Sequence, residues 1–80
     1  MGVVSYIFYI EGIINKRADE VLKELREKVS KNIVGCIVYN FMSQIQVDFE
    51  KEPTDKELKE IIKTLGAIRY EKVEETAEII

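Results

Sequence analysis

The chain has 80 residues, of which 12 are Lys or Arg and 15 are Asp or Glu, and its formal charge is −3. This length makes one small domain, residues 1–80, near the lower limit at which an apolar core holds a fold unaided. The sequence has no histidine, the commonest general base and metal ligand, and Cys36 is its only cysteine. The mildly acidic balance argues against a nucleic-acid-binding surface, which would be basic on one side.

Residues 1–11 are largely apolar, but they contain neither a basic start nor a small-residue cleavage site, so we expect no signal peptide. The apolar run stops at Glu11, short of the roughly 20 residues that a membrane span needs. A single thiol suits a reducing compartment, and a cytoplasmic location is expected. Abundant Ile, Glu and Lys are compatible with a thermophilic source.

Residues 3–11 are rich in β-branched and aromatic side chains and predict a strand. Apolar residues occur at both parities, which is typical of a strand in the centre of a sheet. If Tyr6, Phe8 and Ile10 point to the core, then Ile7 and Tyr9 lie on the opposite face.

Residues 16–31 have the apolar period of an amphipathic helix. Its stripe consists of Ala18, Val21, Leu22, Leu25 and Val29. Asn15 is the predicted N-cap, because its side-chain oxygen can accept a hydrogen bond from the first turn. Lys16 and Arg17 in that turn oppose the helix dipole, which favours negative charge there.

Residues 32–40 and 44–50 predict a β-hairpin with a turn at 41–43. The first strand is apolar on both faces, whereas the second alternates strictly. Its apolar face is Ile45, Val47 and Phe49, and its polar face is Gln44, Gln46, Asp48 and Glu50. This alternation is typical of a sheet that is covered on one face only.

Residues 54–65 carry the clearest helix signals. Thr54 is the predicted N-cap, Glu57 completes a capping box, and Gly66 provides the C-terminal stop. The predicted buried stripe is Leu58, Ile61, Ile62 and Leu65.

Residues 67–75 predict a short last strand. Ile68 and Tyr70 are expected on one face of this strand, and Arg69 and Glu71 on the other. Residues 76–80 are expected either to fray or to add a short cap.

The element order is therefore βαββαβ, with two amphipathic helices and one openly half-polar strand. Both helices are expected to cover the same face of an antiparallel sheet. The predicted fold is the ferredoxin-like α+β two-layer sandwich with strand order 4-1-3-2, in which the first and third strands are central.

Three segments carry a resemblance to a known family. Ile10-Glu11-Gly12-Ile13 is similar to a strand end of the pattern V-x-G-M, residues 18–29 to the first-helix stripe, and residues 62–67 to a second-helix ending I-x-x-x-G-Y. On these residues the chain resembles the heavy-metal-associated domain, the fold of copper chaperones and of the N-terminal modules of metal-pumping ATPases. The resemblance spans Tyr6 to about Val73.

The metal motif of that family, M-x-C-x-x-C, is missing. In register, its methionine corresponds to Ile13 and its cysteines to Asn15 and Ala18. The family's thiolates bind soft cations at a helix N-terminus, and neither an amide nor a methyl group can replace them. We therefore expect a degenerate domain with no metal ligand and no cofactor.

Two surfaces are candidates for binding. The first is the turn formed by Ile13, Ile14, Asn15, Lys16 and Arg17, where two cations lie beside a helix N-terminus. First-turn surface charges usually have no function, and that interpretation remains open.

The second surface is the open sheet face with its edge strand. Ile7 and Tyr9 contribute to it, together with either Ile37 and Tyr39 or Val34, Cys36 and Val38, depending on parity. Exposed edges are normally protected by charge, and this one has none, which indicates a partner or self-association. Alternatively, the chain ends or Phe41 and Met42 bury this strand.

Cys36 is interpreted first as a small core residue. A dimer bridged by Cys36 through a metal or a disulfide is the alternative, because one thiol per chain can build a soft-metal site only by pairing chains.

Two activities of similar topology are disfavoured. RNA-recognition modules need exposed aromatics and a basic residue on the third strand, which here carries Gln44, Gln46 and Asp48. Acylphosphatase-like enzymes need an arginine in a Gly-rich turn after the first strand, and Arg17 follows only one glycine. No nucleophile and base occur at a recognisable spacing, so no enzyme is expected.

The favoured hypothesis is a non-enzymatic module of the heavy-metal-associated type that has lost its cysteines. It would act by contact with a protein partner, as an adaptor in a metal-transport context, and without nucleic acid or membrane. The alternative is a dimeric, ACT-like regulatory domain that holds a small anion near Lys16 and Arg17.

Overall fold

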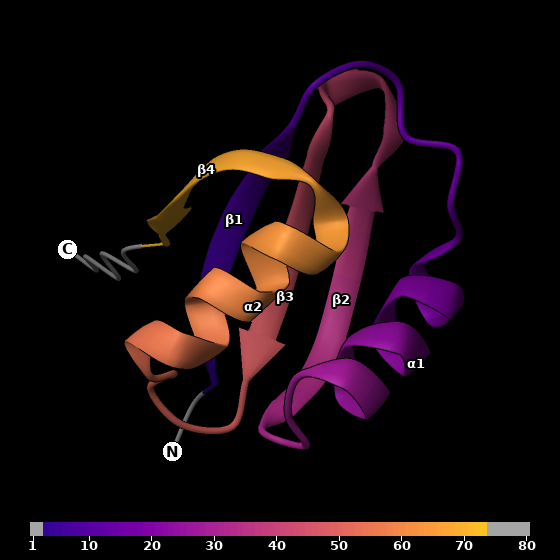
Figure 1. Cartoon of the computed structure of the whole chain (residues 1–80). Coiled ribbons are helices and arrows are strands. Elements are labelled where there is room, and N and C mark those ends of the chain that lie inside the picture. The colour runs from indigo at the N-terminus through magenta and orange to yellow at the C-terminus, as the bar shows by residue number, and fades with distance from the viewer. Residues whose placement is uncertain (1–2, 74–80) are drawn as a thin grey trace, which may run out of the picture.

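The computed structural model describes residues 3–73 of the chain (Figure 1). Its elements are β1 (Val4–Ile10), α1 (Ala18–Lys28), β2 (Ile33–Tyr39), the 3₁₀ turn η1 (Asn40–Met42), β3 (Gln44–Phe49), α2 (Asp55–Leu65) and β4 (Ala67–Lys72). Residues 76–80, for which fraying or a cap was expected, lie outside the described residues.

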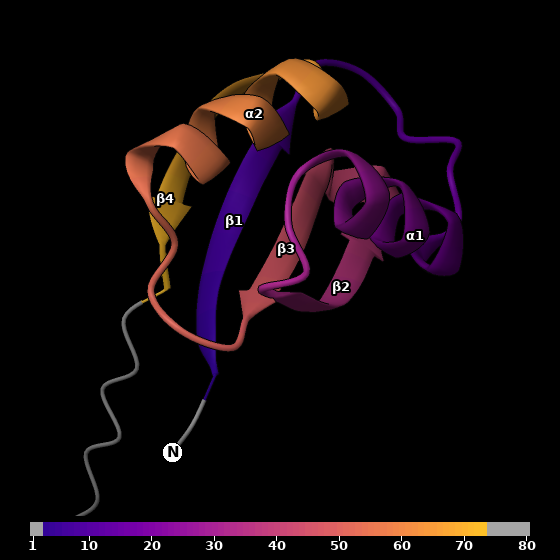
Figure 2. The ribbon, with the colours of Figure 1, turned by 60° about the horizontal axis from the view of Figure 1, so that its bottom comes forward.

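Within residues 3–73, the four strands form one antiparallel sheet in the order β2-β3-β1-β4. Counted from the β4 edge, this order is 4-1-3-2. β1 and β3 are central, and β2 and β4 are the edges. In Figure 1 both helices are drawn in front of the sheet, and in the turned view of Figure 2 α2 lies above β1 and α1 lies beside β2. This α+β arrangement is compatible with a ferredoxin-like fold.

A single cluster of buried apolar side chains joins the sheet to the two helices. Its largest fully buried members are Phe8, Phe49, Leu25, Ile33, Ile61, Val21 and Val47. Alternation along β3 accounts for the sheet side, because Ile45, Val47 and Phe49 are buried while the residues between them are half-buried. The predicted alternation of this strand is confirmed.

The predicted start and stop of α2 are also confirmed. The Thr54 hydroxyl accepts a hydrogen bond from the Glu57 backbone N–H at 3.1 Å, and the Glu57 carboxylate accepts one from the Thr54 N–H at 2.8 Å. Gly66 adopts a left-handed conformation with φ 71°, and its N–H donates to the Ile62 carbonyl at 2.8 Å. The side chains of Leu58 and Ile61, which belong to α2, are buried in the core.

The predicted start of the first helix is wrong. α1 begins at Ala18, its N-cap is Arg17 in an extended conformation, and Asn15 lies outside it. The physical reason is that Ile14 is buried and that its carbonyl accepts a hydrogen bond from the Asn40 side chain at 2.7 Å. These two attachments hold Ile14 against the β2–β3 connection, and the helix begins only after the exposed residues that follow it.

The predicted faces of β4 need a correction. Tyr70 packs on the Tyr6 and Phe8 rings, with centroids 5.8 and 5.7 Å away. Ile68, which was expected on the same face, is 64% exposed because the pairing of β1 with β4 shifts register between Tyr9 and Ile10.

A glycine in β2 is required by a close contact. The Asp48 carboxylate accepts hydrogen bonds from the Ser5 hydroxyl at 2.7 Å and from the Gln46 amide at 3.0 Å. A Cβ at Gly35 would lie 2.9 Å from an oxygen of that carboxylate. The register of β2 shifts between Ile33 and Gly35, beside this contact.

A hydrogen bond links the core to the loop before α2. The Tyr6 hydroxyl donates to the Glu52 carboxylate at 2.6 Å, and Lys72 Nζ contacts the other Glu52 oxygen at 2.9 Å. The bond to Glu52, with burial as a smaller cause, raises the pKa of Tyr6 from 10.0 to about 12. The same bond, followed by Lys72, lowers the pKa of the Glu52 carboxyl.

Replacing Tyr6 by phenylalanine should therefore lower the free energy of unfolding by about 1 kcal/mol at neutral pH. Because the pKa of Tyr6 is higher in the folded chain than the ordinary value of 10.0, the protonated hydroxyl stabilises the fold fully below pH 10. This stabilisation is lost as the pH rises towards 12. Urea unfolding between pH 7 and 12 should show the decline in the wild type and a weaker one in Tyr6→Phe. Equal stability and equal pH dependence of both proteins would contradict this assignment.

Candidate functional site

Two connections meet at one end of the sheet and form the candidate site. We call this surface the loop end; it comprises residues 11–17, between β1 and α1, and residues 40–43, between β2 and β3. Gly12 has φ 91°, a backbone conformation that side chains rarely adopt, and it turns the chain out of β1. The purple and magenta connections lie together at the top of Figure 1.

Hydrogen bonds hold the two connections together. Asn40 donates from its side-chain amide to the Ile14 carbonyl at 2.7 Å, and the Ser43 hydroxyl donates to the Gly12 carbonyl. The Ile10 N–H donates to the Ser43 carbonyl at 2.8 Å. With Ile14 buried beneath them, the loops form a defined surface.

The loop end exposes large apolar side chains. Phe41 is 95% exposed, Ile13 is 70% exposed and Met42 is 62% exposed. The alternative in which Phe41 and Met42 bury β2 is therefore wrong, because both side chains of η1 face solvent. The other alternative, burial by the chain ends, involves residues outside the described range 3–73. Sequence reasoning assigned these two residues to an ordinary turn, although an apolar pair in a tight connection was itself a signal of a binding surface.

A surface hollow of about 520 Å³ lies beside these side chains. It is lined by residues 13–18 together with Val38, Asn40 and Phe41. Asn15 and Ala18, which the sequence resemblance predicts to stand in place of the family's cysteines, also line this hollow. A smaller hollow of about 150 Å³ on the same turn is lined by residues 13–16 with Ile10, Ile45 and Leu65. All five residues of the predicted turn, 13–17, thus line the larger hollow.

The two cations of the turn already have partners. Lys16 Nζ lies 3.7 Å from the Glu24 carboxylate, and Arg17 Nε lies 3.3 Å from Asp19. The backbone N–H groups of the α1 start are also used: that of Arg17 donates to Glu20 at 3.3 Å, and that of Glu20 donates to Asp19 at 2.9 Å. This helix start therefore attracts an external anion less than the sequence alone indicated.

The open sheet face contains four of the five predicted interface residues. Ile7 pairs with Gln46 and Ile37 pairs with Gln46 from the other side, while Tyr9 and Tyr39 both pair with Gln44. Residues that are paired directly across two strands point to the same face of the sheet. Of the two sets of β2 residues that the sequence left open, Ile37 and Tyr39 therefore lie on the open face.

Polar contacts cover the β4 side of this face. The Tyr9 hydroxyl donates to Glu71 at 2.6 Å, and the Arg69 guanidinium lies 3.7 Å from the centre of the Tyr9 ring. Hydrogen bonding to Glu71 raises the pKa of Tyr9. The β2 side is more apolar, since Ile37 is 42% exposed.

Cys36, the fifth predicted interface residue, lies elsewhere. It pairs with buried Val47 and packs against the core, on the side opposite to Ile37 and Tyr39. The interpretation of Cys36 as a small core residue is thus confirmed, and the alternative parity with Cys36 on the open face is wrong, because the alternation of β2 turns it inward. Burial, with a smaller contribution from Asp48, raises the pKa of the Cys36 thiol to about 11.

In residues 3–73, His, Cys, Asp and Glu side chains form no group of three or more that could hold a metal ion. Among the same residues, no helix has the length and hydrophobicity to cross a membrane. Comparisons of the chain with protein-family models, curated proteins and solved structures find no match.

Cys36 should react slowly with thiol reagents at pH 7.5, because only the thiolate is nucleophilic and its pKa is raised. We expect alkylation by iodoacetamide at least about tenfold slower than for the same thiol in the urea-unfolded chain. Mass spectrometry of timed samples measures both rates. A native rate equal to the unfolded rate would contradict the inward placement.

Proposed function

We propose that the chain is a ferredoxin-like two-layer sandwich of the heavy-metal-associated type, with both helices on one face of the sheet. In this proposal it is a non-enzymatic, cytoplasmic module that binds a protein partner through the loop end. The observation that carries the proposal is the exposure of Phe41, beside Ile13 and Met42, on loops that hydrogen bonds hold together.

The exposed side chains indicate how a partner would bind. A phenylalanine that is 95% exposed makes few contacts in its own chain, so its burial by a partner would remove apolar area from water at little cost to the fold. Ile13 and Met42 extend the apolar surface, and methionine adapts readily to different partners. The adjoining hollow over residues 13–18 can receive an apolar side chain of the partner.

The polar groups of the loop end would form the rim of this contact. Lys16 and Arg17 are exposed, and their ion pairs with Glu24 and Asp19 are of the kind that contributes little to stability. An acidic group on the partner could therefore exchange with those carboxylates. Such rim charges affect the association rate and specificity more than the affinity.

The metal-transport context of this proposal rests on the sequence resemblance alone. Asn15 and Ala18 occupy the positions of the metal-binding cysteines, and both line the hollow beside Phe41. We infer that the surface used by the family for cargo serves here for protein contact, which makes the chain an adaptor.

The anion-binding alternative has weaker support. It requires cations and backbone N–H groups to be available at the start of α1. Lys16 and Arg17 have carboxylate partners, and two N–H groups of this turn donate to Glu20 and Asp19. An added anion would have to displace these acidic side chains.

Changing Phe41 to serine should weaken partner binding without loss of stability. Affinity capture from cells that express the chain naturally, with quantitative mass spectrometry, identifies the partner, and titration with that purified partner gives the affinity. We expect the Kd to rise by about tenfold or more, as for the loss of a central aromatic anchor, with an unchanged melting temperature.

The matched control is Val3→Ser, which removes an apolar side chain that is 57% exposed and lies immediately before β1. It should bind the partner like the wild type. Equal affinities of Phe41→Ser and the wild type would contradict the proposal, as would an equal loss in both variants.

Copper(I) should not bind tightly to the monomer, because no thiolate lies at position 15 or 18. A titration against a chelating competitor measures this directly, and Asn15→Cys with Ala18→Cys is the positive control. Tight one-to-one binding by the wild-type monomer would contradict the assignment.

A further inference from the structure

A half-buried carboxylate lies on the open sheet face. Asp48 of β3 pairs directly with Gly35 of β2 on one side and with Ser5 of β1 on the other, and all three residues are half-buried. Aspartate and glycine are both depleted in strands, and a glycine inside a strand often marks a place where another group approaches closely. Two residues that strands disfavour therefore lie side by side at one point of this face.

The Asp48 carboxylate has one oxygen without a donor and no cation as its partner in residues 3–73. Its Oδ1 accepts hydrogen bonds from the Ser5 hydroxyl at 2.7 Å and from the Gln46 amide at 3.0 Å. Its Oδ2 lies beside Gly35, where an added Cβ would be 2.9 Å from it. The ion pairs of the described chain use other carboxylates, namely those of Asp19, Glu24, Glu52 and Glu71. The donors to Asp48 are neutral, so its charge is not compensated.

Two apolar rows adjoin Asp48 on the same face. In each row two apolar side chains flank a glutamine: Ile7, Gln46 and Ile37 form the nearer row, and Tyr9, Gln44 and Tyr39 form the farther one. Residues two positions apart along a strand are separated by about 7 Å. The face therefore presents a carboxylate, then aliphatic side chains, then aromatic rings, in steps of that length.

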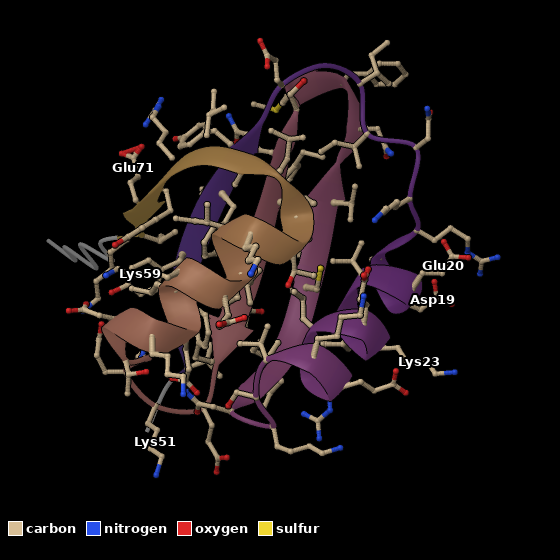
Figure 3. The ribbon with its side chains drawn as sticks, viewed as in Figure 1. Asp19, Glu20, Lys23, Lys51, Lys59 and Glu71 are labelled. Carbon is tan, nitrogen blue, oxygen red and sulfur yellow. The ribbon has the colours of Figure 1, made fainter. Side chains whose placement is uncertain are left out.

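The other charges of this face compensate each other. The Arg69 guanidinium lies over the Tyr9 ring and its Nη1 is 3.5 Å from the Glu71 carboxylate. Figure 3 shows Glu71 at the β4 side of the molecule, whereas Lys23 of α1 points away from the protein at the other side. Asp48 is thus the charge on this face that remains for a cation of another molecule.

We propose that the open sheet face binds an amphipathic helix of a partner protein, and that a lysine or arginine of this helix pairs with Asp48 Oδ2. Side chains one turn apart on a helix are separated by about 6 Å along its axis, which matches the spacing of the rows. The apolar stripe of the helix covers Ile7 and Ile37. The lysine or arginine stem is itself apolar, so it lies on aliphatic surface while its charged end reaches the carboxylate. Because Gly35 has no side chain, there is room for that end beside Oδ2.

A basic helix is the occupant that this face selects. The backbone hydrogen bonds of a sheet run between its strands, so a partner that lies on the face meets side chains and no backbone groups. A helix satisfies its own backbone groups, whereas an extended segment on this face would leave them unpaired. A partner without a cation would bury the Asp48 charge uncompensated, which is costly, whereas an ammonium or guanidinium group forms a charge-assisted hydrogen bond with it.

A synthetic helix with a single lysine tests the pairing. The probe peptide carries a stripe of leucines with one lysine at its end, and glutamine and alanine elsewhere. The matched peptide has glutamine in place of the lysine. Fluorescence anisotropy of the labelled peptides gives both Kd values, and we expect the wild-type chain to bind the lysine peptide about tenfold more tightly, as for a close charge pair.

Asp48→Asn is the matched change in the protein. It keeps an oxygen acceptor for Ser5 and Gln46 and removes the charge, so the preference for the lysine peptide should disappear in a chain that still folds. Glu27→Gln removes the same charge from an exposed position on α1 and should retain the preference. Ile37→Ser should weaken both peptides alike, because it removes apolar contact and leaves the carboxylate in place.

Equal affinities of the two peptides for the wild type, or no binding of either, would overturn the proposal. So would a preference that survives in Asp48→Asn, or one that Glu27→Gln reduces as much, because the lysine would then respond to net charge alone. Backbone amide shifts in NMR should locate the lysine peptide on β1, β2 and β3, and shifts confined to the loop end would overturn the assignment. Phe41→Ser should leave both affinities unchanged, so this proposal and the one for the loop end fail separately.

Discussion

The structure depends on burying one face of a four-stranded sheet. Phe8 of β1 and Val47 and Phe49 of β3 are inaccessible to solvent, and the opposite parity carries Ser5, Gln44, Gln46 and Asp48. Because side chains alternate along a strand, a shift of one residue in β3 would expose the core and bury these polar groups. This constraint sets the register of both central strands, and it also determines which side chains remain for contact with other molecules.

The loop end and the open sheet face are two consequences of that arrangement. Ile14 is drawn into the core, and the Asn40 side chain ties its carbonyl to the neighbouring connection. Ile13 and Phe41 are thereby left facing solvent on a defined backbone. On β2, the same alternation turns Cys36 inward and Ile37 outward. Each surface is therefore a product of packing in the domain and a candidate for binding outside it.

Much of the fold could be predicted from the sequence, because its signals are local. Strict alternation identified the faces of β3, and the Thr54–Glu57 capping box with Gly66 identified both ends of α2. The start of α1 could not be predicted in this way. Asn15 is a good N-cap by residue type, but a hydrogen bond from Asn40, 26 positions away from Ile14, keeps this segment extended. The exposure of Ile68 likewise follows from a register shift between β1 and β4, which no local sequence pattern predicts.

The candidate site was predictable only in part. Residues 13–17 were predicted as a binding turn from a sequence resemblance, and they do line the hollow. Phe41 and Met42 were missed, since their exposure depends on the direction of η1. The positive character of Lys16 and Arg17 was overstated, because sequence alone does not show that Glu24 and Asp19 lie within ion-pair distance.

Binding at the loop end depends on Phe41 and Ile13 facing solvent on an ordered backbone. NMR with a soluble paramagnetic probe measures this most directly, through the relaxation of side-chain protons. We expect strong relaxation enhancement at Phe41, Ile13 and Met42, protection at Ile14, and backbone order at residues 12–17 similar to that of the strands. A protected Phe41 ring packed over β2, or a loop end as mobile as an unfolded segment, would contradict it.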